Sequence, residues 1–352
     1  MTSDTKFAQE LNKSLTDIQE ARDFLTTHET QEVPVFMEAL VHSYDAGEKS
    51  FHLSAEGQRF RLTRTAYMEF CQQIGIPGKF ADRIPNDLLI RCVDEMLDST
   101  NDKVRLLVRD KDVICGVKRD SYIGTNPRDF LGAADRLLAG HMFREANISD
   151  EGSSLLFEPM SGQMIQPSVE NLNDRYNIGI AFQIGQSGGL LEAHPYSLRH
   201  VCTNVAVTRS ESTKHQLVEK VRRANVNRYY ERLLESYETD RYTVYMQELS
   251  NRISRAINEP LTDWNYAQAY GQTAKLLGKE VTLALLGVAE DRHNEIQQEI
   301  KTKKLRDKWR REDSTALDEL SLYEVFNSVT AAARGYSGLE RSRLQEIGGE
   351  LL

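Results

Sequence analysis

The chain has 352 residues, of which 28% are charged and 40% belong to the hydrophobic set. This composition is typical of a globular protein and excludes a chain that is disordered throughout. The formal net charge of −9 argues against a protein that coats duplex DNA through bulk positive charge. It leaves room for a local basic site, because only the charge near the contacting surface matters there.

The cysteines show neither a metal-binding pattern nor a disulfide framework. They are not spaced as CxxC pairs, and each lies in an apolar stretch, at Cys71, Cys92, Cys115 and Cys202. Reduced, buried thiols are the simplest interpretation. The first residues lack the apolar segment of a secretion signal, and no apolar run approaches the length of a bilayer-spanning helix. We therefore expect a cytoplasmic protein without a membrane partner, in the host cytoplasm if a phage encodes it.

Helices are predicted for most of the first hundred residues. Apolar residues recur at three- and four-residue steps over residues 8–28, which predicts a helix. Thr63 is placed to cap a second helix that continues through Cys71. Pro85 precedes a third helix over residues 88–97.

Strand signals follow, and they are antiparallel in character. Residues 104–108 and 113–117 alternate apolar with polar side chains around a turn, which predicts a hairpin. A helix is expected over residues 127–138. The clearest strand covers residues 176–184, where large apolar residues alternate with small or amide side chains. A glycine-rich reversal leads from it to a returning strand over residues 190–201.

Helices predominate after residue 212. Apolar periodicity predicts them over residues 217–234, 242–257, 263–277 and 281–304. Ser321 and Glu324 form a capping box that predicts a last helix, ending at Gly335. No strand is expected in this part of the chain.

Together these elements predict an α+β fold, with an antiparallel sheet core and short helices followed by a helical C-terminal region. We expect an N-terminal helix and linker over residues 1–35, the α+β core over residues 36–210, and the helical region over residues 211–352. The absence of a repeated βαβ pattern argues against a doubly wound parallel sheet.

No catalytic signature is evident in the sequence. The glycines of residues 185–189 follow a strand but lack the lysine of a phosphate loop, so a hairpin turn is the better interpretation. His194 and His200 lie on one predicted strand, without an acidic or thiol side chain beside both to complete a metal site. We therefore expect no cofactor and no metal ion, and a non-enzymatic role is favoured.

Two clusters of basic residues depart from the acidic average. Between residues 199 and 228, seven basic residues stand against two acidic ones. The basic residues of this first cluster are Arg199, Arg209, Lys214, Lys220, Arg222, Arg223 and Arg228. The second cluster places an aromatic ring among its cations, and its candidate contacts are Lys303, Lys304, Lys308, Trp309 and Arg310. Cations that track phosphates, with a ring that stacks on a base, are typical of a single-strand groove. A solvated helix face is the alternative for either cluster.

Six short segments resemble a family of phage- and plasmid-encoded proteins that share the "domain of unknown function 932". They are FRLT at 60–63, CQQIGIP at 71–77, VRLLVR at 104–109, GVKRDSY at 116–122, LRHVCTN at 198–204 and LYEVFNSVT at 322–330. The resemblance implies a mobile-element protein, often encoded among genes for DNA replication and recombination. It brings no established catalytic residues.

Three functions remain open. The first is a non-enzymatic phage or plasmid accessory protein that binds single-stranded nucleic acid as a homo-oligomer, to protect or anneal it. The second is an interaction module whose amphipathic helices bind a host or phage protein. The third is an enzyme whose site is assembled from residues distant in sequence, with Arg199, His194 and His200 as candidates.

Overall fold

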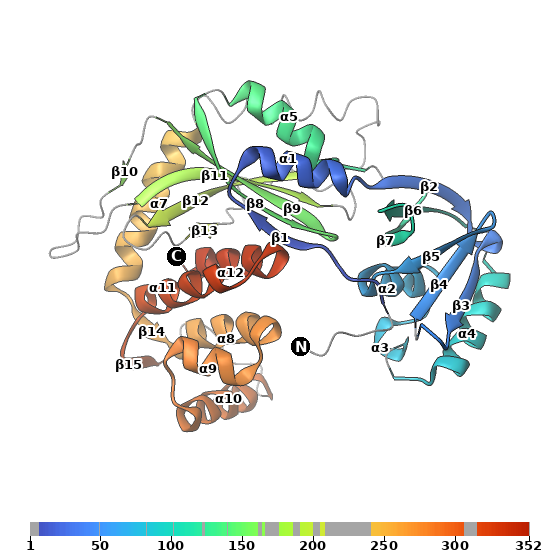
Figure 1. Cartoon of the computed structure of the whole chain (residues 1–352). Helices are drawn as coiled ribbons and strands as arrows, with labels where there is room; N and C mark the ends of the chain where they lie inside the picture. The colour runs from blue at the N-terminus through green and yellow to red at the C-terminus, as the bar shows by residue number, and fades with distance from the viewer. Residues whose placement is uncertain are drawn as a thin grey trace.

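The computed structural model describes most of the chain. The described residues are 7–48, 50–81, 83–100, 102–121, 124–138, 140–160, 164–165, 176–185, 191–199, 205–207, 241–305 and 315–351. They form two large sheets that are mostly antiparallel, and a helical C-terminal region that includes a two-stranded sheet (Figure 1). The α+β class and the helical C-terminal region predicted from the sequence are confirmed.

The first sheet has six strands in the order β2-β6-β7-β5-β4-β3, and all pair antiparallel except β5 with β7. The strands are β2 (Gln31–Phe36), β3 (Val41–Asp45), β4 (Ser50–Ala55), β5 (Gln58–Leu62), β6 (Lys103–Arg109) and β7 (Val113–Arg119). Its helices are η1 (Met37–Ala39), α2 (Arg64–Gln73), α3 (Gly78–Ala81) and α4 (Asn86–Asp98). The predicted hairpin is confirmed as β6 and β7. The Thr63 cap is also confirmed, because its hydroxyl accepts the Ala66 N–H at 3.2 Å.

The second sheet has the order β1-β8-β9-β11-β12-β13, with β10 paired to β11, and is antiparallel throughout its described pairs. Its strands are β1 (Asn12–Leu15), β8 (His141–Ser149), β9 (Gly152–Pro159), β10 (Met164–Ile165), β11 (Tyr176–Gly185), β12 (Leu191–Arg199) and β13 (Val205–Val207). Helices α1 (Ile18–Thr27) and α5 (Pro127–Leu137) cover one face (Figure 1). That face is apolar: the Phe182 ring lies 5.0 Å from Phe130 and 5.9 Å from Phe157.

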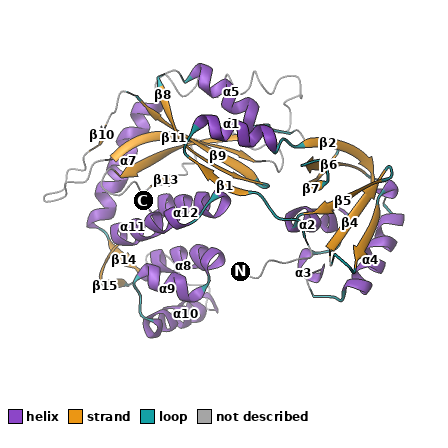
Figure 2. Cartoon of the chain, in the orientation of Figure 1, coloured by secondary structure: helices purple, strands orange, loops and turns teal. Residues whose placement is uncertain are grey.

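The remaining described elements are mostly helical, as Figure 2 shows. They are α7 (Arg241–Asn258), β14 (Pro260–Thr262), α8 (Asp263–Leu277), α9 (Lys279–Leu286), α10 (Glu290–Leu305), β15 (Ala316–Ser321), α11 (Leu322–Ala332), η5 (Ala333–Gly335) and α12 (Gly338–Leu351). The predicted capping box is confirmed, with Ser321 and Glu324 exchanging hydrogen bonds at the start of α11. Helix α12 returns to the second sheet and packs on the face opposite α1 and α5 (Figure 1).

Three details of the sequence prediction were wrong. Residues 8–28 are not one helix: β1 pairs with β8, and α1 begins only after Asp17, whose carboxylate accepts the Glu20 N–H at 2.8 Å. The helix expected over residues 281–304 is interrupted at Gly287, whose positive φ of 68° ends α9.

The third error concerns strands after residue 212. β14 and β15 pair there, which the sequence analysis did not expect. The helix predicted over residues 217–234 lies outside the described residues.

The hydrophobic cores show how the described elements are grouped. β1 pairs with β8 in the second sheet and α1 packs on it, because Leu15, Ala21 and Leu25 lie in its apolar core. Residues 36–210 supply all described strands of the two sheets except β1 and most of β2, and each sheet has a core of its own. Helices α11 and α12 tie the C-terminal region to the second sheet.

Candidate functional site

The tip of the β8–β9 hairpin joins the two sheets through a buried ion pair. Arg109 at the end of β6 donates from Nε to Asp150 Oδ1 at 2.9 Å and from a terminal nitrogen to Oδ2 at 3.2 Å. Asp150 also accepts the Leu11 N–H at 2.8 Å. Burial alone would lower the pKa of Arg109, but the hydrogen bond and charge of Asp150 raise it overall. The pair fixes the position of one sheet against the other.

A polar cleft of about 350 Å³ opens beside this joint, and we call it the junction cleft. Helix α2 and β7 form its wall on the first sheet, β8, β9 and β11 form its floor, and α12 forms the opposite wall. The lining residues are Thr65, Glu69, Lys118, Asn147, Glu151, Gly152, Ser153, Ser154, Gln183, Ile184, Leu339, Ser342, Arg343 and Glu346. Most of these side chains are polar, which is unusual because small-molecule pockets are ordinarily lined by apolar groups.

The floor belongs to a polar row that crosses five strands. Strand register aligns Ser14, Asn147, Ser154, Gln183 and Glu192 on β1, β8, β9, β11 and β12. Since side chains alternate between faces, the next residue along each strand points to the opposite, apolar face. The sheet therefore has one dry face under α1 and α5, and the polar row lies on the face under α12, beside a small apolar cluster of Leu156, Ala181, Tyr196 and Leu198.

A hydrogen-bonded network links this polar face to α12. The Asn147 amide donates to Glu145 Oε1 at 2.7 Å, and Gln345 donates to the same oxygen at 3.2 Å. Arg341 forms an ion pair with the other oxygen of Glu145. Glu145, Asn147 and Gln345 are buried, so their mutual bonds offset the desolvation of their polar groups.

Nearer the cleft, a second set of bonds fixes the start of α12. The Gly338 N–H donates to the Ser14 hydroxyl at 2.8 Å, which anchors the helix on β1. Gln183 donates to Glu346, whose carboxylate is 6% exposed. Ser342 donates weakly to the same oxygen at 3.5 Å. The wall formed by α12 is thus positioned by polar contacts.

The charged groups of the cleft are mixed in sign. Lys118 is paired with Glu69, and Arg343 lies 4.0 Å from Glu346. Arg343 is half exposed, so its charge remains accessible to solvent. The cleft can therefore contact both anionic and cationic groups.

Glu151 adds a carboxylate at the hairpin tip. Desolvation raises its pKa, and the neighbouring charges of Glu10 and Glu69 add to the shift against the opposing charge of Arg343. A carboxyl with a raised pKa is a better hydrogen-bond donor or proton carrier than an ordinary surface glutamate.

Ser154 lies at the centre of the floor. It is 3% exposed, and its hydroxyl has no hydrogen-bond partner among the described residues. A buried hydroxyl without a partner costs free energy, which a ligand group in the cleft would recover.

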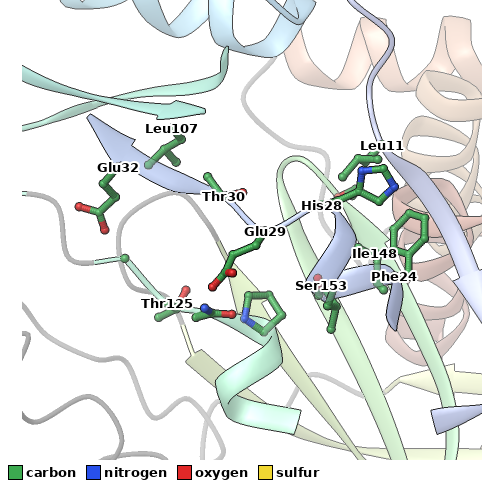
Figure 3. A pocket seen from close by; sticks show the side chains of 15 residues that line it. Leu11, Phe24, His28, Glu29, Thr30, Glu32, Leu107, Thr125, Ile148 and Ser153 are labelled. Carbon is green, nitrogen blue, oxygen red and sulfur yellow. The ribbon is translucent and has the colours of Figure 1, made fainter. Parts of the chain in front are cut away.

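A smaller pocket of about 150 Å³ lies on the other side of the same hairpin (Figure 3). Leu11, Phe24 and Ile148 supply apolar surface, and His28 lies beside them. His28 Nδ1 is 2.8 Å from Asp110 Oδ1, and Asp110 contacts Arg109 of the buried pair. Ser153 lines both cavities, so the hairpin separates them.

The basic residues proposed from the sequence are described only in part. Arg199 is the last residue of β12, and Lys303 and Lys304 lie in the last turn of α10. Residues outside the described ranges are Arg209, Lys214, Lys220, Arg222, Arg223, Arg228, Lys308, Trp309 and Arg310. Helix α12 contacts β13 and α8, and α8 contacts α10. Helices α12 and α8 therefore lie between Arg199 of the first cluster and Lys303 and Lys304 of the second (Figure 1).

His194, a candidate in the enzyme hypothesis, is fully buried on the polar face. Its Nε2 lies 2.9 Å from Glu192 Oε2. The other histidine of that hypothesis, His200, lies outside the described residues. The described cysteines form no disulfide with one another, and burial raises the pKa of Cys115 to about 12, with the charge of Asp150 adding to the shift. Cys115 is therefore a core thiol and a poor nucleophile.

Sequence reasoning did not find the junction cleft. Its residues extend from Thr65 to Glu346 and converge only in the folded chain. One signal was present, since the strand over residues 176–184 alternates large apolar side chains with small or amide ones, and Gln183 is one of the amides.

Comparisons of the chain with protein-family models, with curated proteins and with solved structures found no match. Across the described ranges, no helix combines the length and the apolar character needed to cross a bilayer.

Proposed function

We propose that the protein binds a small polar molecule in the junction cleft. The polar row that crosses the second sheet and forms the cleft floor carries this proposal. Polar groups on the covered face of a sheet add little net stability, because each must first be desolvated. On the opposite face, the same strands place apolar residues at the matching positions.

The lining defines the chemistry of the ligand. Ser154, Asn147 and Gln183 offer hydroxyl and amide groups on the floor, and Arg343 and Glu151 offer charges at the rim. Such a set suits a molecule with both hydrogen-bond donors and an anionic group. Amino acids and nucleoside monophosphates have these features, and a cleft of about 350 Å³ is of a size suited to them.

A thermal-shift screen tests this proposal. The full chain is heated with amino acids, nucleoside monophosphates or neutral monosaccharides, each at millimolar concentration. We expect a compound of the first two classes to raise Tm, because a ligand that binds only the folded state stabilises it. The rise should shrink in Ser154→Ala and Arg343→Gln, and persist in the control Ser99→Ala, because the exposed Ser99 hydroxyl donates only to the Met96 carbonyl at the end of α4. The proposal fails if no compound raises Tm, or if both cleft variants respond as the wild type does.

A second candidate is the binding of single-stranded nucleic acid by a homo-oligomer, for protection or annealing. It is supported by the local excess of basic residues between positions 199 and 228, where seven basic residues stand against two acidic ones. Binding of a labelled oligonucleotide should weaken steeply with salt, because phosphate contacts release counterions. It should also weaken when Arg222 and Arg223, or Lys303 and Lys304, are changed to Gln. Binding that is insensitive to salt and to both double changes would exclude this candidate.

The resemblance to the domain of unknown function 932 family supports the mobile-element context of this second candidate. In that context the protein would act in the cytoplasm of the host cell. A complex with a host or phage protein is the remaining alternative, and it predicts a stoichiometric protein partner without nucleic acid in a pull-down from infected cells.

A further inference from the structure

The turn between β3 and β4 brings together metal-ligating side chains that take no part in the junction cleft. Asp45 ends β3, and Glu48 and His52 follow it in the turn and in β4. One potential ligand atom from each residue lies within 4.8 Å of the other two. The strand register places Ser50 directly opposite Asp45, so its hydroxyl joins the group.

The separation between His52 and Glu48 matches the coordination shell of a small transition-metal ion. His52 Nε2 lies 3.2 Å from Glu48 Oε2, and the Ser50 hydroxyl lies 2.7 Å from that nitrogen and 3.3 Å from that oxygen. Zinc binds nitrogen and oxygen ligands at about 2.0–2.1 Å, so two ligands of a tetrahedral site lie roughly 3.3 Å apart. The observed His52–Glu48 distance is close to this value.

The side chains are also held in place before any ion binds. His52 is 3% exposed, and its Nε2 is the ring nitrogen that faces the carboxylates. Asp45 Oδ1 accepts the backbone N–H groups of Gly47 and Glu48 at 2.8 and 3.0 Å. A buried imidazole and a fixed carboxylate lose little freedom on binding a metal. Glu48 is more than half exposed, which leaves an entry path from solvent.

One charge opposes a cation here. Arg59 donates to Asp45 Oδ2 at 2.8 Å. Its side chain is about half exposed, so solvent and salt screen its repulsion of a bound ion. Removing this charge should strengthen metal binding.

From this geometry we propose that Asp45, Glu48 and His52 bind a zinc-like divalent transition-metal ion. Three protein ligands leave a fourth tetrahedral position, next to the Ser50 hydroxyl, for water or another small ligand. The site is independent of the function proposed for the junction cleft, because none of its residues lines that cleft.

Cobalt(II) is the probe that tests the site. Titration of the full chain should produce the strong visible absorption of four-coordinate Co²⁺, and equimolar Zn²⁺ should remove it. Glu48→Gln should weaken binding at least about 100-fold, because losing even an outer-shell partner of a metal ligand costs about 10–100-fold. Glu48 is exposed, so this variant should fold normally. His52→Gln should abolish the absorption.

Two further variants distinguish a metal site from nonspecific binding. Arg59→Gln should bind Co²⁺ more tightly than the wild type. His28→Gln, which alters a histidine–aspartate pair elsewhere, should leave the titration unchanged. The proposal is overturned if the wild type gives only the weak absorption of hydrated Co²⁺, or if Glu48→Gln binds the ion as tightly as the wild type.

Discussion

Two buried polar side chains, His42 in the first sheet and Glu145 in the second, have different surroundings. In the first sheet, His42 lies against the rings of Phe51, Tyr67 and Phe70, and neither of its ring nitrogens has a hydrogen-bond partner among the described residues. In the second sheet, Glu145 accepts bonds from several side chains. The buried His42 thus lacks a polar partner within the described ranges, whereas Glu145 belongs to a hydrogen-bonded network that borders the junction cleft, and this network favours the second sheet and its cleft as the functional part.

The largest effect is expected on the dry face of the second sheet. Phe182→Ala should lower the free energy of unfolding by about 4 kcal/mol, because it removes a fully buried ring that packs on Phe130 and Phe157. Phe36→Ala is the matched control and should lose much less, since Phe36 is 50% exposed. Urea denaturation measures both. Equal losses would mean that this face is not a packed core.

The joint between the sheets should be nearly as sensitive. Asp150→Ala leaves the Arg109 guanidinium buried without its partner, and should cost about 3 kcal/mol. The exposed pair of Arg61 and Asp112 is the control, and Asp112→Ala should cost no more than about 1 kcal/mol. If denaturation shows the same small loss for both variants, the buried pair does not hold the sheets together.

The unpartnered histidine of the first sheet should make stability depend on pH. Burial lowers the pKa of His42 from 6.5 to about 4, so its protonation opposes folding. The free energy of unfolding is therefore unaffected by titration of His42 above pH 6.5, and it falls as the pH drops from 6.5 towards 4, because the unfolded chain takes up the proton first. Relative to His42→Leu, the wild type should therefore lose about 2 kcal/mol between pH 7 and pH 5. Parallel stability curves for the two proteins over this range would contradict the burial of a neutral imidazole.

The smallest effect is expected on the polar face. Gln183→Ala removes a donor to Glu346 and should cost only about 1 kcal/mol. The exposed Gln72 of α2 gives the control, and Gln72→Ala should change stability by less than about 0.5 kcal/mol. A loss for Gln183→Ala as large as that for Phe182→Ala would show that the polar face is needed for folding instead of for binding.

Elements could be predicted from the sequence where the alternation of apolar and polar residues, or a local capping motif, agrees with what the element contacts in the fold. The strand over residues 176–184 was recognised because Ile180, Phe182 and Ile184 all pack into one core, and α11 was recognised because Ser321 and Glu324 form a local capping box. β8 and β9 were missed because several of their polar residues face α12. From the sequence alone, polar residues that alternate along a strand suggest a face that is exposed to solvent. The break between β1 and α1 was missed because pairing with β8 overrides local periodicity.

The candidate sites were less accessible to sequence analysis. The junction cleft joins Lys118, Ser154 and Arg343, which are distant in the chain and belong to no motif. Asp45 and His52 come together only because β3 and β4 form a hairpin. The basic clusters were found from local composition, and most of their residues lie outside the described ranges.

Hydrogen exchange tests the central claim most directly. The compound that raises Tm most in the thermal-shift screen is added, and amide exchange is followed by mass spectrometry with and without it. The account predicts slower exchange in residues 150–155 and 339–346, which border the junction cleft, and little change in β3 and β4 of the first sheet. Protection confined to other parts of the chain, with these two segments unchanged, would contradict the assignment of the cleft as the binding site.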